Sequence, residues 1–226
     1  PISMSQVFTF WSTITPRTIF RNIFELASGH FMKISQGKTM IQPVWSLKFP
    51  VEKETYFKGT INDAAEELEK LLEDAVRIRL RADVQVAAYL SGGLDSSATT
   101  ALIKKVAPET LQTVSIGFED TEFDETPFQQ EVSKYLGTKH TAFTCTRQDI
   151  GNYFPQVVWH SEIPILRSAT VPMFCLSKKV RENNIKVVIT GEGADEILAG
   201  YDIFKESIIR EFWSRQPNSK YRPLLL

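Results

Sequence analysis

The segment from Val86 to Ser97 constrains the fold and chemistry of this chain more than any other. An apolar run, Val86-Ala87-Ala88-Tyr89-Leu90, breaks off into Ser91-Gly92-Gly93, and an amphipathic stretch begins at about Asp95. This order predicts a strand, a glycine turn and the start of a helix. Backbone N–H groups in the first turn of a helix have no partner within it, and the helix dipole adds positive potential there. The segment therefore predicts an anion site where a strand meets a helix.

Serines and one carboxylate make this turn more specific. Glycines allow the backbone to approach a phosphate or pyrophosphate closely, and hydroxyl groups can donate further hydrogen bonds. The predicted contacts come from Ser91, Gly92, Gly93, Ser96 and Ser97. Asp95 would repel a bare phosphate, which indicates a divalent cation between the two. The turn has neither the Gly-Lys-Ser/Thr ending of a P-loop nor the G-x-G-x-x-G order of a dinucleotide fold. The alternative is that the glycines only form a tight turn.

Composition limits the class of protein. The chain has 226 residues, of which 42% are hydrophobic, enough for one large domain or somewhat more. A net charge of −1 gives no electrostatic argument for nucleic acid or a membrane surface as partner. No apolar run approaches the ~20 residues of a membrane span, and the first residues do not form a signal peptide. Cys145 and Cys175 are expected to be buried thiols in a reducing compartment, the cytoplasm.

Strand-like and helical runs alternate, which predicts an α/β fold with a parallel twisted sheet and helices on both faces. Strands are predicted over 84–90, 111–118, 139–145 and 186–190, and helices over 62–81, 96–106, 126–136, 148–160, 170–181 and 202–213. Asn62 or Asp63 is expected to cap the first helix. Residues 1–49 are expected to form a β-rich segment, with a strand-like run over 7–11 and a hairpin near Gln36-Gly37.

A second polar cluster follows the strand predicted over 186–190. It reads Gly191-Glu192-Gly193-Ala194-Asp195-Glu196 and carries three carboxylates. Ligands collect beyond the carboxyl ends of parallel strands, and Mg²⁺ prefers one or two carboxylates together with phosphate oxygens. We therefore expect Asp95 and Asp195 to face each other across Mg²⁺, which leaves Glu192 for another role. The alternative is a solvated acidic loop in which Asp195 caps the next helix.

A third cluster follows the strand predicted over 111–118. Gly117 at the end of this strand permits close approach of a flat group such as adenine. The acidic residues of 119–125 are more typical of a solvated loop and a helix cap. Arg167 lies in a loop that enters a helix, where its fork of donors suits an anionic substrate carboxylate; a plain surface charge is the alternative.

The motifs SGGLDSS, SIGFED followed by FDET, and GEGADEILAGY resemble, in this order, the synthetase domain of glutamine-dependent asparagine synthetases. The first motif is similar to the pyrophosphate loop of PP-loop ATP pyrophosphatases, which implies an adenine nucleotide alpha hydrolase-like fold. Residues 7–49 resemble the tail of the family's glutaminase domain, a class II amidotransferase. The resemblance implies a glutaminase remnant over 1–49, a linker over 50–61 and a synthetase domain over 62–226 that is truncated at its C-terminus.

This resemblance implies an ATP-dependent amide ligase. Aspartate, ATP and glutamine-derived ammonia would give asparagine, AMP and pyrophosphate through β-aspartyl-AMP, with Mg²⁺ required. The implied ATP contacts include Leu90, Ile116, Gly117, Thr190 and Gly191. Glu192 would take a proton from ammonia, and Arg167 would bind substrate or pyrophosphate. The family's glutaminase nucleophile is an N-terminal cysteine, whereas residue 1 here is proline, so we expect no glutaminase activity from this chain.

Other functions remain open at this point. One is a relative that adenylates a different carboxylate, as in natural-product amidation. Another is a non-catalytic ATP-binding fragment, because both ends look cut: Pro1 replaces a start methionine, and the chain stops in the apolar run Leu224-Leu225-Leu226. The expected partners are small molecules and an N-terminal glutaminase domain, and a homodimer is left open.

Overall fold

The computed structural model describes residues 1–48, 56–109, 111–215 and 217–218. The chain divides into two compact units, one formed by residues 1–71 and 145–179 and the other by residues 72–144 and 180–226. Residues 50–55 of the linker expected over 50–61, and the terminal run 224–226, lie outside the described residues. The expected domain boundaries therefore stay predictions.

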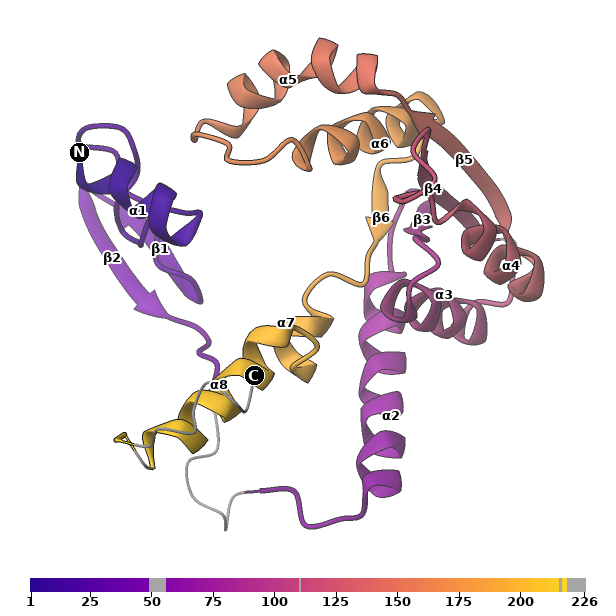
Figure 1. The fold of residues 1–226 in the computed structure, drawn as a ribbon, viewed down its shortest axis with the longest axis horizontal. Coiled ribbons are helices and arrows are strands. Elements are labelled where there is room, and N and C mark those ends of the chain that lie inside the picture. Colours follow the sequence, from indigo (N-terminus) through magenta and orange to yellow (C-terminus); the bar gives the residue numbers. More distant parts are fainter. Residues whose placement is uncertain (49–55, 110, 216, 219–226) are drawn as a thin grey trace. The chain divides into compact units, whose positions relative to one another are not determined.

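The second unit is built on a four-stranded sheet in the order β5-β4-β3-β6 (Figure 1). Its strands are β3 (Val86–Tyr89), β4 (Gln112–Phe118), β5 (Lys139–Cys145) and β6 (Val187–Ile189). Strand β3 pairs in parallel with β4 on one side and with β6 on the other. The chain thus passes from β3 outward to β5 and returns to β6 beside β3. This reversal creates a topological switch point between β3 and β6, the place where ligands bind in open α/β sheets.

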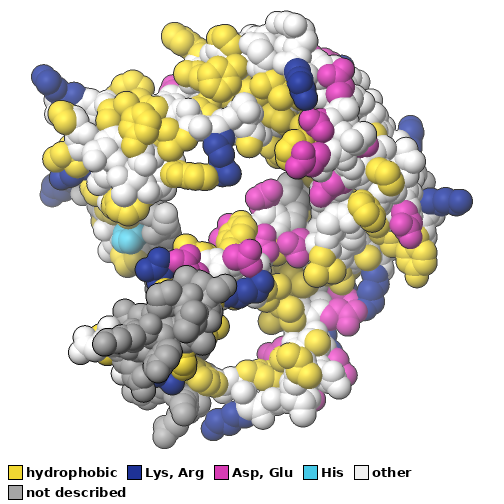
Figure 2. Space-filling view, in the orientation of Figure 1, with side chains coloured by type: hydrophobic (Ala, Val, Ile, Leu, Met, Phe, Trp, Pro, Cys, Tyr) yellow, Lys and Arg dark blue, Asp and Glu magenta, His cyan; other side chains and the backbone are white. Residues whose placement is uncertain are grey.

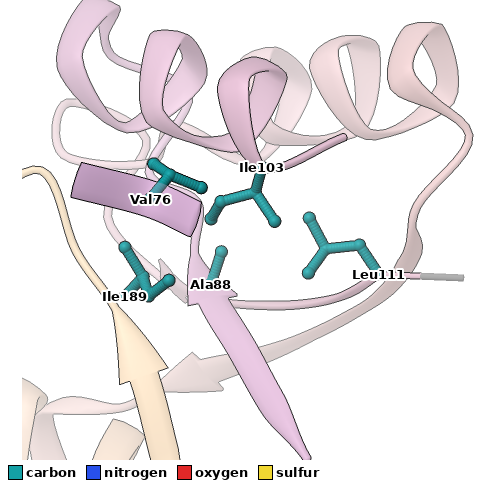
Figure 3. Close-up of a cluster of buried hydrophobic side chains, with 5 residues drawn as sticks. All are labelled: Val76, Ala88, Ile103, Leu111 and Ile189. Carbon is teal, nitrogen blue, oxygen red and sulfur yellow. The ribbon is translucent and has the colours of Figure 1, made fainter. Parts of the chain in front are cut away.

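Helices cover the face of this sheet that contains the core. They are α2 (Ile61–Arg79), α3 (Leu94–Val106) and α4 (Thr126–Leu136). Two more helices follow β6, the five-residue α7 (Ala194–Leu198) and the longer α8 (Asp202–Ser214). Figure 3 shows the core cluster, in which Val76, Ala88, Ile103, Leu111 and Ile189 meet. Ile103 is only 1% exposed, so α3 is held on β3 by burial of apolar side chains. The predicted α/β fold with a parallel sheet is confirmed.

The first unit contains an antiparallel hairpin, three further helices and the part of α2 up to Leu71. The hairpin joins β1 (His30–Ser35) to β2 (Lys38–Pro43), and the helices are α1 (Ile2–Phe10), α5 (Arg147–Ser161) and α6 (Thr170–Glu182). Gln36 and Gly37 have φ of 50° and 73°, as a two-residue hairpin turn requires. The hairpin predicted at this dipeptide is confirmed.

Two local predictions in this part of the chain are wrong. The run 7–11 is not a strand: residues through Phe10 belong to α1, where the Thr9 hydroxyl donates to the carbonyl of Ser5 one helical turn earlier. Helix α2 is not capped by Asn62 or Asp63. Instead the Thr60 hydroxyl accepts from the Asp63 N–H (3.2 Å) and the Asp63 carboxylate accepts from the Thr60 N–H (2.7 Å), a reciprocal capping box. The Thr60 hydrogen bonds lower the pKa of Asp63.

The surface of the described residues is rich in apolar side chains. Hydrophobic groups lie over much of the face seen in Figure 2, and on α8 the exposed fractions of Ile203, Ile208 and Phe212 are 66%, 70% and 57%. Extensive patches of this kind are typical of surfaces that another protein or domain covers. Cys145 and Cys175 are buried, as predicted, at 2% and 6% exposed. Among the helices described, none is long and apolar enough to span a bilayer.

A chain of hydrogen-bonded polar side chains lies between β4, β5 and α4. The His140 ring lies 2.9 Å from the Thr113 hydroxyl through Nδ1 and 3.1 Å from the Ser115 hydroxyl through Nε2. Ser115 Oγ donates in turn to Gln129 Oε1 at 2.7 Å. Because the Ser115 proton is used in that bond, Ser115 accepts from an Nε2–H group, and Nδ1 accepts from Thr113. The network therefore suits a neutral imidazole, and burial lowers the pKa of His140.

This geometry predicts a pH dependence of stability. Below about pH 6.5 the unfolded chain protonates His140 more readily than the folded chain, so the free energy of unfolding should fall as the pH drops below that value. Urea unfolding between pH 7.5 and 5 should show a smaller loss for His140→Gln than for the unmodified chain. An equal loss of unfolding free energy in the two proteins would mean that His140 does not contribute to the pH dependence of stability.

Candidate functional site

Residues 91–97, called the anion loop below, connect β3 to α3. Leu90 is 1% exposed, and its N–H donates to the carbonyl of Val114 at 3.1 Å, which holds the end of β3 against β4. Gly93 is the N-cap of α3, and the first hydrogen bond of the helix runs from the Ser97 N–H to the Gly93 carbonyl at 3.0 Å. The N–H groups of residues 94–96 precede that bond. N–H groups at such a helix start have no partner within the helix and can bind an anion, and the anion site itself stays a prediction.

The three serines of the anion loop have different surroundings. Ser91 Oγ lies 2.9 Å from Ser96 Oγ and accepts from the Gly93 N–H at 3.2 Å, while Ser96 Oγ accepts from the Ser91 N–H at 3.2 Å. Ser91 and Ser96 therefore hold the loop in shape. Ser97 Oγ is buried and has no hydrogen-bond partner within the described residues. An unpaired buried hydroxyl next to a helix start fits a site that holds a phosphate group.

A second loop, residues 190–196, lies against the first turn of α3. We call it the acidic loop. A Cβ atom added at Gly191 would lie 3.1 Å from the backbone carbon of Asp95 and 3.2 Å from the backbone nitrogen of Ser96. Glycine at position 191 therefore avoids a tight contact between the two loops. The structure thus brings together the first and second polar clusters predicted from the sequence, at the switch point between β3 and β6.

The acidic side chains of the second loop are not equivalent. Gly193, with φ of 94°, is the N-cap of α7, and Asp195 lies within its first turn rather than at the cap, which excludes the capping alternative. The Asp195 carboxyl lies where a side chain at Gly200 would be, so Gly200 makes room for it. Glu196 accepts a hydrogen bond from the Tyr201 hydroxyl at 3.0 Å, which raises the pKa of Tyr201. Glu192 is exposed to solvent.

Asp95 and Asp195 are the residues that could hold a divalent cation. Within the described residues no three His, Cys, Asp or Glu side chains form a group that could bind a metal by themselves. Two carboxylates completed by phosphate oxygens are the donor set that Mg²⁺ prefers. Oxygen donors of this kind fit Mg²⁺, and the metal role of Asp95 and Asp195 stays a prediction.

The carboxyl end of β4 forms another edge of the second unit. Asp124 Oδ1 accepts from the Thr126 hydroxyl at 2.6 Å and from the Phe118 N–H at 3.3 Å, so it ties the end of β4 to the start of α4. The bond from Thr126 lowers the pKa of Asp124. A Cβ atom at Gly117 would lie 2.6 Å from Thr126 Oγ1. The group that lies close to Gly117 in this structure is thus the Thr126 side chain. That Ile116 and Gly117 contact a nucleoside stays a prediction.

Arg167 lies in the first unit. Its guanidinium carbon stands 3.9 Å from the centre of the Trp11 ring, a cation–π contact. Arg167 is exposed to solvent. Its predicted role in binding substrate or pyrophosphate stays a prediction.

The contacts of Gly92 predict a measurable difference between two glycine substitutions. Gly92 has φ of 87°, and an added Cβ would lie 2.7 Å from Phe128 Cβ, whereas at Gly137, with φ of 62°, no described atom lies within 4 Å. Gly137→Ala should therefore lower the free energy of unfolding only by its backbone cost, about 1 kcal/mol. Gly92→Ala should cost about 2–4 kcal/mol, because a steric overlap is added. Urea unfolding measures both, and equal losses would contradict the packing of α4 on Gly92.

Comparison with known proteins assigns the family. The asparagine synthase family model matches residues 67–225. A glutamine-hydrolyzing asparagine synthetase from Bacillus subtilis (strain 168) is 31% identical over 205 residues, covering 87% of this chain and 32% of that protein. The amidase chyE of Penicillium rubens is 32% identical over 213 residues, with 88% and 32% covered.

Among solved structures, the NH3-dependent NAD synthetase from Campylobacter jejuni has a TM-score of 0.43 and 18% sequence identity, and the match covers 60% of each chain. The chain spans about a third of the length of the two curated relatives above, at 32% of each. Since the family model matches more than half of the chain, this protein belongs to the asparagine synthase family.

Proposed function

We propose that this chain binds ATP at the anion loop and serves in an ATP-dependent amide ligase that converts aspartate and ammonia to asparagine. The observation that carries the proposal is the contact between Gly191 and the first turn of α3. It sets anion-binding backbone groups and carboxylates side by side at a switch point of a parallel sheet. Family membership and the asparagine synthetase from Bacillus subtilis support the amide-forming reaction.

The first step of the proposed reaction activates a carboxylate. An oxygen of the aspartate side chain attacks the α-phosphorus of ATP. The bond between this phosphorus and the oxygen that bridges it to the β-phosphorus breaks, and β-aspartyl-AMP and pyrophosphate result. The leaving group carries several negative charges, so the site has to stabilise it electrostatically. The N–H groups of residues 94–96 and the Ser97 hydroxyl are the donors we assign to this task.

The metal requirement follows from the carboxylates around these donors. Asp95 in the anion loop would oppose the phosphates of ATP without a cation between them. We propose that Asp95 and Asp195 hold Mg²⁺, which supplies neutralisation of the phosphate charge when bound. We also assign Thr190 and Gly191 to the lining of the ATP site, and the close approach of Gly191 to the first turn of α3 supports this assignment.

The second step forms the amide. The nitrogen of ammonia attacks the acyl carbon, the bond between that carbon and the AMP oxygen breaks, and one proton leaves the nitrogen. Glu192 is the group we assign to accept that proton, since a carboxylate beside the acyl-adenylate can act as a general base. Arg167 is assigned to the anionic groups of the substrate or of pyrophosphate. Ammonia would come from glutamine through a glutaminase domain of the longer protein, acting in the cytoplasm.

A second candidate is amidation of a different carboxylate. It is favoured by the amidase-named relative in Penicillium rubens, which is as similar to this chain as the asparagine synthetase is. The adenylation site would be the same, and only the carboxylate substrate would differ.

The proposal predicts aspartate-dependent formation of AMP and pyrophosphate. ATP, Mg²⁺, aspartate and ammonia should yield both products in equal amounts together with asparagine, measured by chromatography of nucleotides and amino acids. Omitting aspartate should stop AMP formation. ATP binding without aspartate-dependent AMP would overturn the asparagine assignment, and a panel of other carboxylates would then test the second candidate.

The metal assignment predicts the effect of Asp95→Asn. This substitution keeps the size of the side chain and removes its charge, so Mg²⁺-dependent pyrophosphate release should fall at least about a hundredfold. The circular dichroism spectrum should not change. Asp74→Asn, on the exposed face of α2, is the matched control and should keep full activity. Full activity of Asp95→Asn would remove Asp95 from the metal site.

A further inference from the structure

We propose that Gln129 is a positioning residue that sets the spacing between the nucleoside end and the phosphate end of the ATP site. This inference rests on the proposed function, because it assigns a role within the same site. Gln129 lies in α4, outside all three sequence motifs, and is 1% exposed. A glutamine this buried requires partners for both ends of its amide.

The side chain of Gln129 holds the end of strand β4. Its Nε2 donates to the carbonyl of Ile116 at 2.9 Å, and its Oε1 accepts from the Ser115 hydroxyl at 2.7 Å. Both partners lie in β4 directly before Gly117, where the nucleoside is expected. Because one planar amide binds two successive residues of the strand, it fixes the position of the Ile116 peptide group relative to α4.

The backbone of the same residue touches the anion loop. A Cβ atom added at Gly92 would lie 2.9 Å from the Gln129 nitrogen and 2.7 Å from Phe128 Cβ. Helix α4 thus packs on Gly92 through its first turns. Gln129 is therefore in contact with the phosphate-binding loop by its main chain and with the nucleoside-binding strand by its side chain.

This double contact matters because ATP has a limited span between adenosine and its phosphates. A site that binds both ends at once gains affinity only if the two subsites keep the matching separation. The amide of Gln129 connects the two subsites through one residue. Without it, the pairing of β3 with β4 and the bond from the Leu90 N–H to the Val114 carbonyl would remain, but the side-chain hydrogen bonds from α4 to Ser115 and Ile116 would be lost.

A network on the far side keeps the Gln129 amide in one orientation. Ser115 Oγ is also within 3.1 Å of His140 Nε2, and His140 Nδ1 is within 2.9 Å of the Thr113 hydroxyl. The donation from Gln129 to the Ile116 carbonyl requires that Oε1 face Ser115. His140, from β5, is the titratable group that is hydrogen-bonded within this arrangement. Asp124, before α4, accepts from the Thr126 hydroxyl and from the Phe118 N–H at the end of β4.

The test compares Gln129→Leu with Ser133→Ala. Ser133 is also buried in α4, at 6% exposed, and its hydroxyl lies 2.8 Å from that of Thr138, which is bonded to Thr113 at the opposite end of the hydrogen-bonded chain from Gln129. We expect Gln129→Leu to weaken binding of a non-hydrolysable ATP analogue with Mg²⁺ about tenfold, measured by calorimetry. Binding of pyrophosphate alone should change little. Ser133→Ala should lower the melting temperature and leave the analogue affinity unchanged.

A second variant keeps the proposal testable if Gln129→Leu fails to fold. In Gln129→Glu a protonated carboxyl can still donate to the Ile116 carbonyl and accept from Ser115, whereas the carboxylate cannot donate. The ratio of its dissociation constant to that of the unmodified chain should therefore rise as the pH is raised. A loss caused only by packing would give a ratio independent of pH.

The outcomes separate the two hypotheses. If the unmodified chain does not bind the ATP analogue, the proposed function is overturned and the role of Gln129 with it. If the unmodified chain binds and Gln129→Leu binds equally well, only the positioning role is overturned. Equal weakening of the analogue and of pyrophosphate would also overturn it, because the defect would then lie in the anion loop alone.

Discussion

The contact between Gly191 and the first turn of α3 is the constraint on which the candidate site depends. Strands β3 and β6 pair in parallel, with Ala88 opposite Ile189, so their carboxyl ends emerge side by side. The segments that follow must then share a space of about one strand spacing, roughly 5 Å. A Cβ atom at position 191 would make tight contacts with Asp95 and Ser96, at 3.1 and 3.2 Å, so the two loops would have to move apart by a few tenths of an ångström. Glycine at residue 191 therefore lets the acidic loop pack closely on the first turn of α3.

Within that site, opposite electrostatic tendencies lie next to each other. The start of α3 presents N–H groups and the positive end of a helix dipole, which favour an anion. Asp95 and the carboxylates of the acidic loop favour a cation. An anion alone would meet the carboxylates, and a cation alone would meet the helix start. A phosphate group and a cation together would satisfy both, which supports our proposal that the junction binds ATP with Mg²⁺.

The parts of the fold that the sequence predicts well are those with a local cause. The apolar run before Gly92 and Gly93 predicts β3 and the start of α3. The dipeptide Gln36-Gly37 predicts the hairpin, and both residues have positive φ in the turn. Predictions failed where the cause is weak or distant. Residues 2–10 bury only Val7, so no alternation identifies their structure, and α7 has five residues, too few to show a helical period. Gln129 could not be assigned from the sequence because its partner Ser115 lies 14 positions away, and Ser115 meets His140 25 positions further on.

The absence of charge in the Gln129 network explains how it can lie buried beside an acidic site. A glutamine, two hydroxyls and a neutral imidazole satisfy one another, so the desolvation cost of the network is offset by hydrogen bonds alone. A buried carboxylate at position 129 would need a counter-charge. A neutral amide needs none, because its partners are the Ser115 hydroxyl and the Ile116 carbonyl. Gln129 can therefore connect α4 to β4 without adding a charge to the interior.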